Sequence, residues 1–331
     1  MITTHKRLDE ISSLPAFTKI ETKKPWRNAD PSYHEEEIPG KGIGLVATRR
    51  IAAGELVLAR TPAVMIDDEG FTELGEGSLT QLLVQAVEDL PEQHRAEYLK
   101  LTTHDEVQSH DERIYQVFAK NNYRTRIANT TDFHATFIDV SRLNHDCRPN
   151  CGYQFDSSTL TQKVYAARDI PAGEELTVAY TDPIQTRDTR QAHLQTMWGF
   201  TCTCKHCTGE EDDVKKSDER MERIHSLWTE LDDYTSASTA TPDMAEELVS
   251  LYEEEGLKTR IHEAYYRAAI EYNGVGASAK AARYAMLSIL RGQMMAGFDR
   301  PFVENMKELV KDPEKHWSWD FRPQEHVKDE L

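Results

Sequence analysis

The stretch Asn144-His145-Asp146-Cys147-Arg148-Pro149-Asn150 carries the most information in this sequence of 331 residues. It places two amide side chains, an imidazole and a thiol within seven residues, and its proline restricts the backbone. A lone histidine would most often be an ordinary, hydrogen-bonded core residue. Flanked by Asn144 and Cys147, His145 is better explained as part of a binding site. We therefore expect this stretch to form the polar centre of a functional site.

The cysteines point to a metal site. All five lie in two short clusters, Cys147 with Cys151 and Cys202 with Cys204 and Cys207. Zinc takes four ligands in a tetrahedron, and the second cluster supplies three thiols at suitable spacing. The fourth ligand must come from elsewhere, and the candidates are Cys147, Cys151 and His206. A disulfide framework would spread its cysteines along the chain, so we expect a metal site.

Around these motifs the sequence alternates between strand and helix signals. Ile51–Leu58 and Ile170–Val178 each contain a glycine turn that leads into an apolar strand, so we expect one small β-fold assembled from both phrases. The Gly-x-Gly of Gly42-Ile43-Gly44 precedes another apolar run. This pattern alone is weak, and its functional interpretation is that missing side chains let a bulky cofactor approach the backbone.

Two regions have helical periodicity. Between the two strand phrases, residues 78–120 look helical, with Leu82, Leu83, Val87 and Leu90 repeating at helical spacing, and they predict an insert on the β-scaffold. After an acidic linker, residues 215–331 contain amphipathic stripes, with Pro242 and Pro301 each at the start of a predicted helix. Small residues alternating with aromatic ones resemble a tetratricopeptide-type hairpin, although a plain helical bundle fits almost as well.

Composition limits the classes of function. Lys and Arg number 39 against 57 Asp and Glu, a net charge of −18, which argues against direct nucleic-acid binding. Acidity suits a lysine-rich partner, although it also simply favours solubility. No run approaches the roughly 18 apolar residues of a membrane span, and the N-terminal segment lacks the apolar region of a secretory signal. We therefore interpret the final Lys328-Asp329-Glu330-Leu331 as a coincidental match to an ER-retention signal.

The order and spacing of the motifs resemble the SET-domain protein lysine methyltransferases, above all the SMYD-type branch and its fungal SET-domain relatives. The resemblance rests on the stretch 144–150, the Gly173–Tyr180 phrase and the Phe200–Cys207 cluster, and it covers roughly residues 38–208. It implies an α+β fold: a SET-domain β-fold with a pseudoknot and a helical insert, a zinc-bound post-SET segment and a C-terminal helical region. The pseudoknot would be a departure from the usual unthreaded connections.

The implied domains follow the same resemblance. They are a polar leader at 1–37, a SET domain at 38–185 with its helical insert at about 67–120, a post-SET zinc segment at 186–210 and a helical domain at 215–331. Two departures from the family stand out. Residues 65–112 contain no cysteine, so the MYND finger of SMYD proteins is absent. Trp198 occupies a position where relatives often have tyrosine, which leaves the number of methyl groups transferred open.

The resemblance also implies the site residues. Tyr180 would be the catalytic residue, at the point where cofactor and target lysine meet. Cys147 would join Cys202, Cys204 and Cys207 around one structural zinc ion and leave Cys151 spare. S-adenosylmethionine would be bound by Lys41, Gly42, Ile43, Gly44, Asn121, Asn144, His145, Tyr180 and Phe200.

The implied activity is methyl transfer from S-adenosylmethionine to lysine side chains of proteins, histone tails or others, in the nucleus or the cytoplasm. The C-terminal helices could recruit protein partners. An alternative is a catalytically degenerate SET module that serves as a cofactor- or protein-binding scaffold. A zinc-dependent hydrolase is excluded because no ligand set with an open coordination position is found in the sequence.

Overall fold

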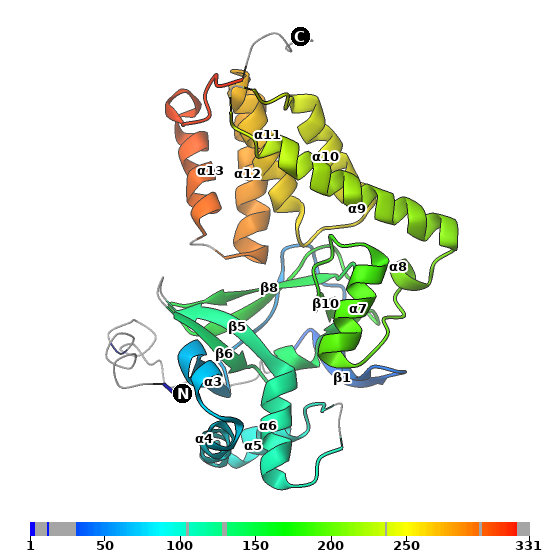
Figure 1. Ribbon diagram of the computed structural model, residues 1–331, viewed down its shortest axis with the longest axis vertical. Helices are drawn as coiled ribbons and strands as arrows, with labels where there is room; N and C mark the ends of the chain where they lie inside the picture. Colours follow the sequence, from blue (N-terminus) through cyan, green and yellow to red (C-terminus); the bar gives the residue numbers. More distant parts are fainter. Residues whose placement is uncertain are drawn as a thin grey trace. The chain divides into compact units, whose positions relative to one another are not determined.

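The computed structural model describes residues 1–3, 12, 31–103, 106–127, 131–235, 237–297 and 300–322 (Figure 1). The chain forms two compact units, one of Met1–Asn144 with Tyr153–Thr177 and one of His145–Gly152 with Val178–Leu331. Strands and helices are both abundant, which confirms the predicted α+β class. Most of the predicted leader and the Lys328–Leu331 sequence lie outside the described residues.

Within the described residues the strands form three small sheets, and the five strand pairs with a defined register are antiparallel. In order across each sheet they are β1 (Tyr33–Ile38), β2 (Gly42–Ala47), β10 (Glu175–Val178) and β7 (Asn144–His145); β3 (Leu56–Arg60), β9 (Thr161–Ala166) and β8 (Cys151–Asp156); and β4 (Val64–Asp67), β6 (Thr131–Thr136) and β5 (Asn122–Ile127).

The two similar phrases of the sequence meet in the first unit. Ile51 and Ile170 exchange both backbone hydrogen bonds at 2.9 Å. Gly54 and Gly173 occupy matching turns, each with φ of +84°, a conformation that favours glycine. The β-fold is thus assembled from both ends of the region, as the repeated phrase predicts.

The helical insert also lies in the first unit. It consists of α3 (Asp68–Glu73), α4 (Glu76–Glu88), α5 (Glu92–Leu99) and α6 (His110–Asn121). The predicted stripe on α4 is correct for Leu83 and Val87, which are buried, and wrong for Leu82, which is 37% exposed. The buried side chains of this region form one apolar cluster: Val64, Ile66, Leu79, Leu83, Val87, Tyr98, Leu101, Ile114, Val117, Phe118 and Ile138.

The second unit is mainly helical. Its helices are α7 (Arg187–Trp198), α8 (Lys205–Thr208), α9 (Glu211–Leu231), α10 (Pro242–Glu254), α11 (Ile261–Gly274), α12 (Ser278–Met295) and α13 (Pro301–Lys311). Figure 1 shows α11, α12 and α13 side by side. Pro242 and Pro301 begin α10 and α13, as predicted, because a first-turn residue needs no backbone N–H. Among the described residues, no helix is both long and apolar enough to cross a membrane.

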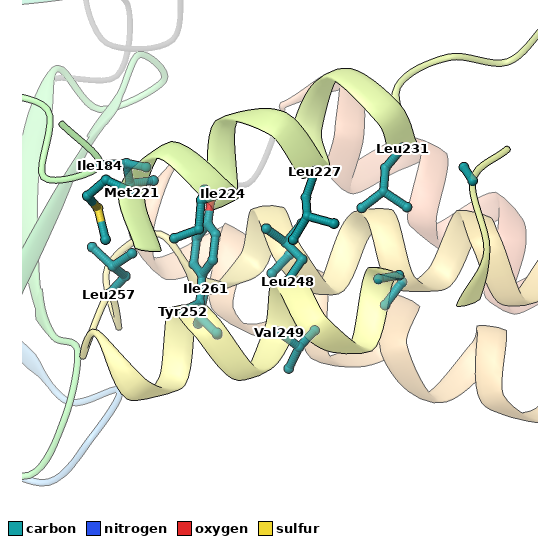
Figure 2. Packing of buried hydrophobic residues seen from close by; sticks show 14 residues of the cluster. Ile184, Met221, Ile224, Leu227, Leu231, Leu248, Val249, Tyr252, Leu257 and Ile261 are labelled. Atoms are coloured by element: carbon teal, nitrogen blue, oxygen red, sulfur yellow. The ribbon is translucent and has the colours of Figure 1, made fainter. Parts of the chain in front are cut away.

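A continuous apolar core joins α9 to α10. Figure 2 shows Ile224 and Leu227 of α9 beside Tyr252 and Leu248 of α10. Met221 of α9 lies beside Ile184 and Leu257 in the same cluster. These side chains are buried, and burying each is worth about 1.5–3 kcal/mol in transfer free energy. The predicted domain boundaries, the pseudoknot and the likeness to a tetratricopeptide hairpin stay predictions.

His262 of α11 gives this unit a pH dependence that can be measured. The side chain is 6% exposed, and its ring stacks on Phe302 with centroids 5.2 Å apart. Burial lowers the pKa of His262 to about 4, helped by Arg260 and opposed by Glu263. The unfolded chain takes up a proton near pH 6.5, whereas the folded chain does so only near the lowered pKa.

We therefore expect the free energy of unfolding to fall as the pH falls from about 6.5 to 4, by up to about 3 kcal/mol from this residue alone. Urea unfolding of the wild type and of His262→Gln at pH 7 and pH 5 measures the effect. The wild type should lose about 2 kcal/mol more than the variant over this interval. Equal losses in both proteins would contradict the assignment.

Candidate active site and metal centre

The first group of predicted site residues lies where β2 begins. Gly42 has φ of +76°, so the turn from β1 into β2 needs glycine there. A Cβ atom on Gly44 would lie only 2.8 Å from Nδ2 of Asn144 and 3.0 Å from Oε1 of Glu175. The missing side chain of Gly44 therefore allows Asn144 and Glu175 to pack directly against the backbone of β2.

Glu175 joins two of the predicted residues by hydrogen bonds. Its Oε2 accepts a hydrogen bond of 2.7 Å from Nζ of Lys41, and its Oε1 accepts one of 2.9 Å from Nδ2 of Asn144. The sequence did not identify Glu175 as a site residue, because two glutamates stand side by side in the phrase. Successive strand residues face opposite sides, and Glu174 instead pairs with Arg168. The register of the strand therefore decides which of the two glutamates binds Lys41 and Asn144.

A substitution at Gly44 tests this packing. In Gly44→Ala the new methyl group would lie within 3.0 Å of Ile38, Asn144 and Glu175 and must displace them. We therefore expect the affinity for S-adenosylmethionine, the cofactor that the resemblance implies, to fall at least about 10-fold. Gly75→Ala is the matched control, because a Cβ there meets no atom within 4 Å. Isothermal titration of both variants measures the effect. Wild-type affinity in Gly44→Ala would contradict the idea that cofactor binding needs Asn144 and Glu175 packed against the backbone of Gly44.

Asn121 and Ile43 also belong to the first unit. Asn121 ends α6, and its amide nitrogen donates to the carbonyl oxygens of Val117 and Thr102, each at 2.9 Å. The hydroxyl of Thr102 is the nearest atom, at 4.0 Å, to a Cβ built on Gly42. Thr102 therefore lies between Asn121 and the Gly42 turn, and the two hydrogen bonds donated by the Asn121 amide both go to backbone carbonyl oxygens. Ile43 is 37% exposed, and its part in a cofactor site stays a prediction.

The second group gathers three predicted aromatic residues in the second unit. The ring of His145 lies 5.5 Å from that of Tyr180 and 6.1 Å from that of Phe200. Tyr180 meets Phe200 edge-on at 6.5 Å, and Trp198 lies 5.3 Å from Tyr180. His145 is buried, whereas Tyr180, Trp198 and Phe200 are half-buried. This half-buried aromatic group can therefore contact a ligand.

Four cysteines converge in the same unit. The Sγ atoms of Cys147, Cys202, Cys204 and Cys207 all lie within 4.8 Å of one another, and all four side chains are buried. The Sγ of Cys147 is 3.6 Å from that of Cys207 and 4.0 Å from that of Cys202. Zinc–sulfur bonds of about 2.3 Å in a tetrahedron separate the sulfur atoms by about 3.8 Å. The quartet thus fits a four-coordinate zinc ion, and within the described residues it includes neither Cys151 nor His206.

Helix α7 supports the quartet with two consecutive side chains. Nε of the buried Arg190 donates to Sγ of Cys147 at 3.2 Å. Gln191 clamps the backbone of Cys202, accepting from its N–H and donating to its carbonyl oxygen, each at 2.8 Å. A buried cation beside the sulfur atoms stabilises thiolate charge. Neither residue was predicted, because a single Arg-Gln pair in a helix carries no motif.

His145 links the aromatic group to the cysteine quartet. The N–H of Tyr180 donates to Nδ1 of His145 at 3.0 Å, so in the neutral ring Nε2 carries the hydrogen. That Nε2 lies 3.4 Å from Sγ of Cys147 and can donate to it. Hydrogen bonding with neighbouring thiols raises the pKa of Cys147 and lowers that of Cys204, so the thiols titrate together. One imidazole therefore connects the backbone at Tyr180 to a sulfur atom of the cysteine quartet.

Comparison with known proteins agrees with this geometry. Residues 42–181 match the family described as SET domain. The chain is 47% identical over 76 residues to the histone-lysine N-methyltransferase SET5 of Meyerozyma guilliermondii, which covers 22% of this chain and 16% of that protein. It is 28% identical over 193 residues to set5 of Schizosaccharomyces pombe, and this alignment covers 58% of this chain and 56% of that protein. It is 36% identical over 101 residues to human SMYD3, and this alignment covers 28% of this chain and 23% of that protein. The chain thus spans between about a sixth and about half of the length of these relatives.

Proposed function

From the SET domain that this chain contains, we propose that it transfers a methyl group from S-adenosylmethionine to the side-chain amine of lysine in another protein. The relatives described above are named histone-lysine N-methyltransferases. The observation that carries the proposal is the grouping of His145, Tyr180 and Phe200 beside the cysteine quartet. A scaffold that only bound proteins would not need this combination.

The cofactor supplies a methyl group on a positively charged sulfur atom. Lys41 and Asn144 offer an ammonium and an amide for its amino-acid portion, and Glu175 holds both. The half-buried ring of Phe200 offers a flat apolar surface for the adenine. The full set of proposed cofactor residues is Lys41, Gly42, Ile43, Gly44, Asn121, Asn144, His145, Tyr180 and Phe200.

The target amine must be neutral to act as a nucleophile. Free lysine has a pKa of about 10.4, so about one amine in two thousand is neutral at pH 7. The aromatic surroundings of Tyr180 disfavour the ammonium form and lower the pKa of a lysine bound there. The Tyr180 hydroxyl orients the amine and does not act as a strong base, since an ordinary phenol with a pKa of about 10 keeps its proton at neutral pH.

Alignment contributes the larger share of catalysis. Holding the amine about 3–3.5 Å from the methyl carbon can lower the barrier by several kcal/mol. Tyr180 can align the amine because two contacts fix its own position. Its N–H binds His145, and its ring contacts Trp198. Trp198 takes the place of a tyrosine in relatives, so the number of methyl groups transferred depends on this indole.

The quartet is proposed to hold one structural zinc ion. Four thiolates close the coordination shell, so zinc would leave no position for an activated water molecule. The metal would tie the segment 202–207 to the loop of Cys147, and thereby hold Phe200 near His145. Metal binding and folding of the site are then linked.

For the substrate, we propose a lysine-rich protein segment, with histone tails as the first candidates. The net charge of −18 concentrates cationic partners near the protein. A nuclear location follows from a histone substrate, and a cytoplasmic one from a non-histone substrate. Helices α9–α13 are a candidate surface for protein partners.

The direct test uses purified protein, S-adenosylmethionine with a labelled methyl group, core histones and a protein extract. We expect label on lysine residues, identified by mass spectrometry after digestion. The Tyr180→Phe variant provides the inactive comparison. Cofactor binding without any transfer would support the alternative of a degenerate SET module and refute the enzyme assignment.

A further inference from the structure

Arg148 and Glu255 form a buried ion pair within the second unit. Their side chains are 5% and 2% exposed, and Nη2 of Arg148 lies 2.5 Å from Oε2 of Glu255. Nε of Arg148 also donates to the carbonyl oxygen of Glu255 at 2.7 Å. A buried charge is costly without a partner, so each residue requires the other.

The rest of the guanidinium group binds the backbone of the site. Nη1 of Arg148 donates to the carbonyl oxygens of Cys147 at 2.9 Å and Pro183 at 3.0 Å. Cys147 belongs to the quartet, and Pro183 follows Tyr180 by three residues. One side chain therefore holds the loop that carries a metal ligand to the segment that follows the catalytic tyrosine. Lysine lacks the planar fork that reaches all of these acceptors.

Glu255 is in turn held by helix α9. It follows the last turn of α10, and its carboxylate accepts from Oγ of Ser217 at 2.8 Å and from Nε of Arg220 at 2.6 Å. A single carboxylate thus joins the first half of α9 and the end of α10 to Arg148. Arg148 and Glu255 are 107 residues apart in sequence, so no local motif predicts the pair.

We propose that Glu255 is a positioning residue of the active site, which acts through Arg148 to fix the backbone at Cys147 and Pro183. The helical region is then a structural part of the site as well as a candidate partner-binding surface. This inference rests on the proposed function for its effect on the cofactor. Its effect on the cysteine quartet is measured without any methyl transfer.

A second buried pair provides a matched control. Arg322 and Glu271 are 2% and 1% exposed and form two hydrogen bonds, at 2.6 and 3.0 Å. Arg322 also binds the backbone carbonyl oxygens of Leu231 and Asp233 at the end of α9. This pair resembles the first in burial and chemistry but binds neither Cys147 nor Pro183. It therefore reports what the loss of a buried carboxylate does to stability alone.

The experiment compares Glu255→Gln with Glu271→Gln in the full chain. Both variants should unfold at a lower temperature. At a temperature at which both are folded by circular dichroism, we expect only Glu255→Gln to release zinc to a chelator at least about 10-fold faster than the wild type. We also expect only this variant to bind S-adenosylmethionine at least about 10-fold more weakly. Equal zinc-release rates in the two variants would overturn the proposal.

The Arg148→Lys variant and amide hydrogen exchange provide two further tests. If Glu255→Gln does not fold, Arg148→Lys retains a cation but loses the fork, and faster zinc release in this variant supports the proposal, whereas a wild-type rate overturns it. Amide hydrogen exchange over residues 145–152 gives a readout that needs neither metal nor cofactor. Faster exchange there in Glu255→Gln but not in Glu271→Gln supports the positioning role, and unchanged exchange overturns it.

Discussion

Replacement of Tyr180 with phenylalanine should reduce methyl transfer at least about 100-fold, because it removes the hydroxyl that we propose orients the amine. The affinity for S-adenosylmethionine should stay within about twofold of the wild type. The substitution keeps the ring, which contacts His145, Trp198 and Phe200, and it keeps the backbone N–H that binds Nδ1 of His145. The aromatic group and the metal centre should therefore remain in place.

Single-turnover transfer with saturating cofactor separates this effect from binding, which calorimetry measures independently. Tyr284→Phe is the matched control, since it removes a hydroxyl that binds Glu246 in the helical region. That variant should transfer methyl groups at the wild-type rate. Wild-type turnover in Tyr180→Phe would refute the assigned role, and a parallel loss of cofactor affinity would show that Tyr180 acts mainly in binding.

Features encoded by local geometry could be predicted from the sequence. Pro242 and Pro301 mark helix starts because proline fits the first turn and few other helical positions. The glycine turns at Gly54 and Gly173 could be recognised because positive φ selects glycine. The face of α4 was predicted less well: Leu82 is exposed although it shares its periodicity with buried neighbours. Periodicity indicates an apolar face, but tertiary packing decides where that face ends.

The residues of the candidate site could likewise be predicted only in part from the sequence. Spacing identified three of the four clustered thiols but left Cys147, Cys151 and His206 as alternatives for the fourth. The resemblance to SET-domain proteins implied Cys147, and the tertiary structure brings Cys147 together with the other three thiols. Glu175 and Arg190 were missed, because their roles depend on strand register and helix packing. Such contacts join residues distant in sequence, for which one sequence alone contains no pattern.

Loss of one thiol of the quartet should remove the metal. We expect about one zinc ion per wild-type chain and less than about 0.1 in Cys204→Ala, since three ligands no longer close a tetrahedral site. Structural zinc contributes about 10–16 kcal/mol of binding free energy, which is available to the folded state. Without it the segment 202–207 is no longer tied to Cys147, and Phe200 loses its support. The affinity for S-adenosylmethionine should therefore fall at least about 10-fold.

Cys151→Ala provides the control from the same part of the chain. Cys151 is as deeply buried as Cys147 but lies outside the quartet, so its loss costs packing without costing a metal ligand. Plasma mass spectrometry should find about one zinc ion in this variant, and its cofactor affinity should match that of the wild type. Equal zinc contents in Cys204→Ala and Cys151→Ala, or no zinc in the wild type, would contradict the four-cysteine site. Because the two substitutions remove the same sulfur atom from buried positions, a difference in zinc content between the two variants reports on metal coordination.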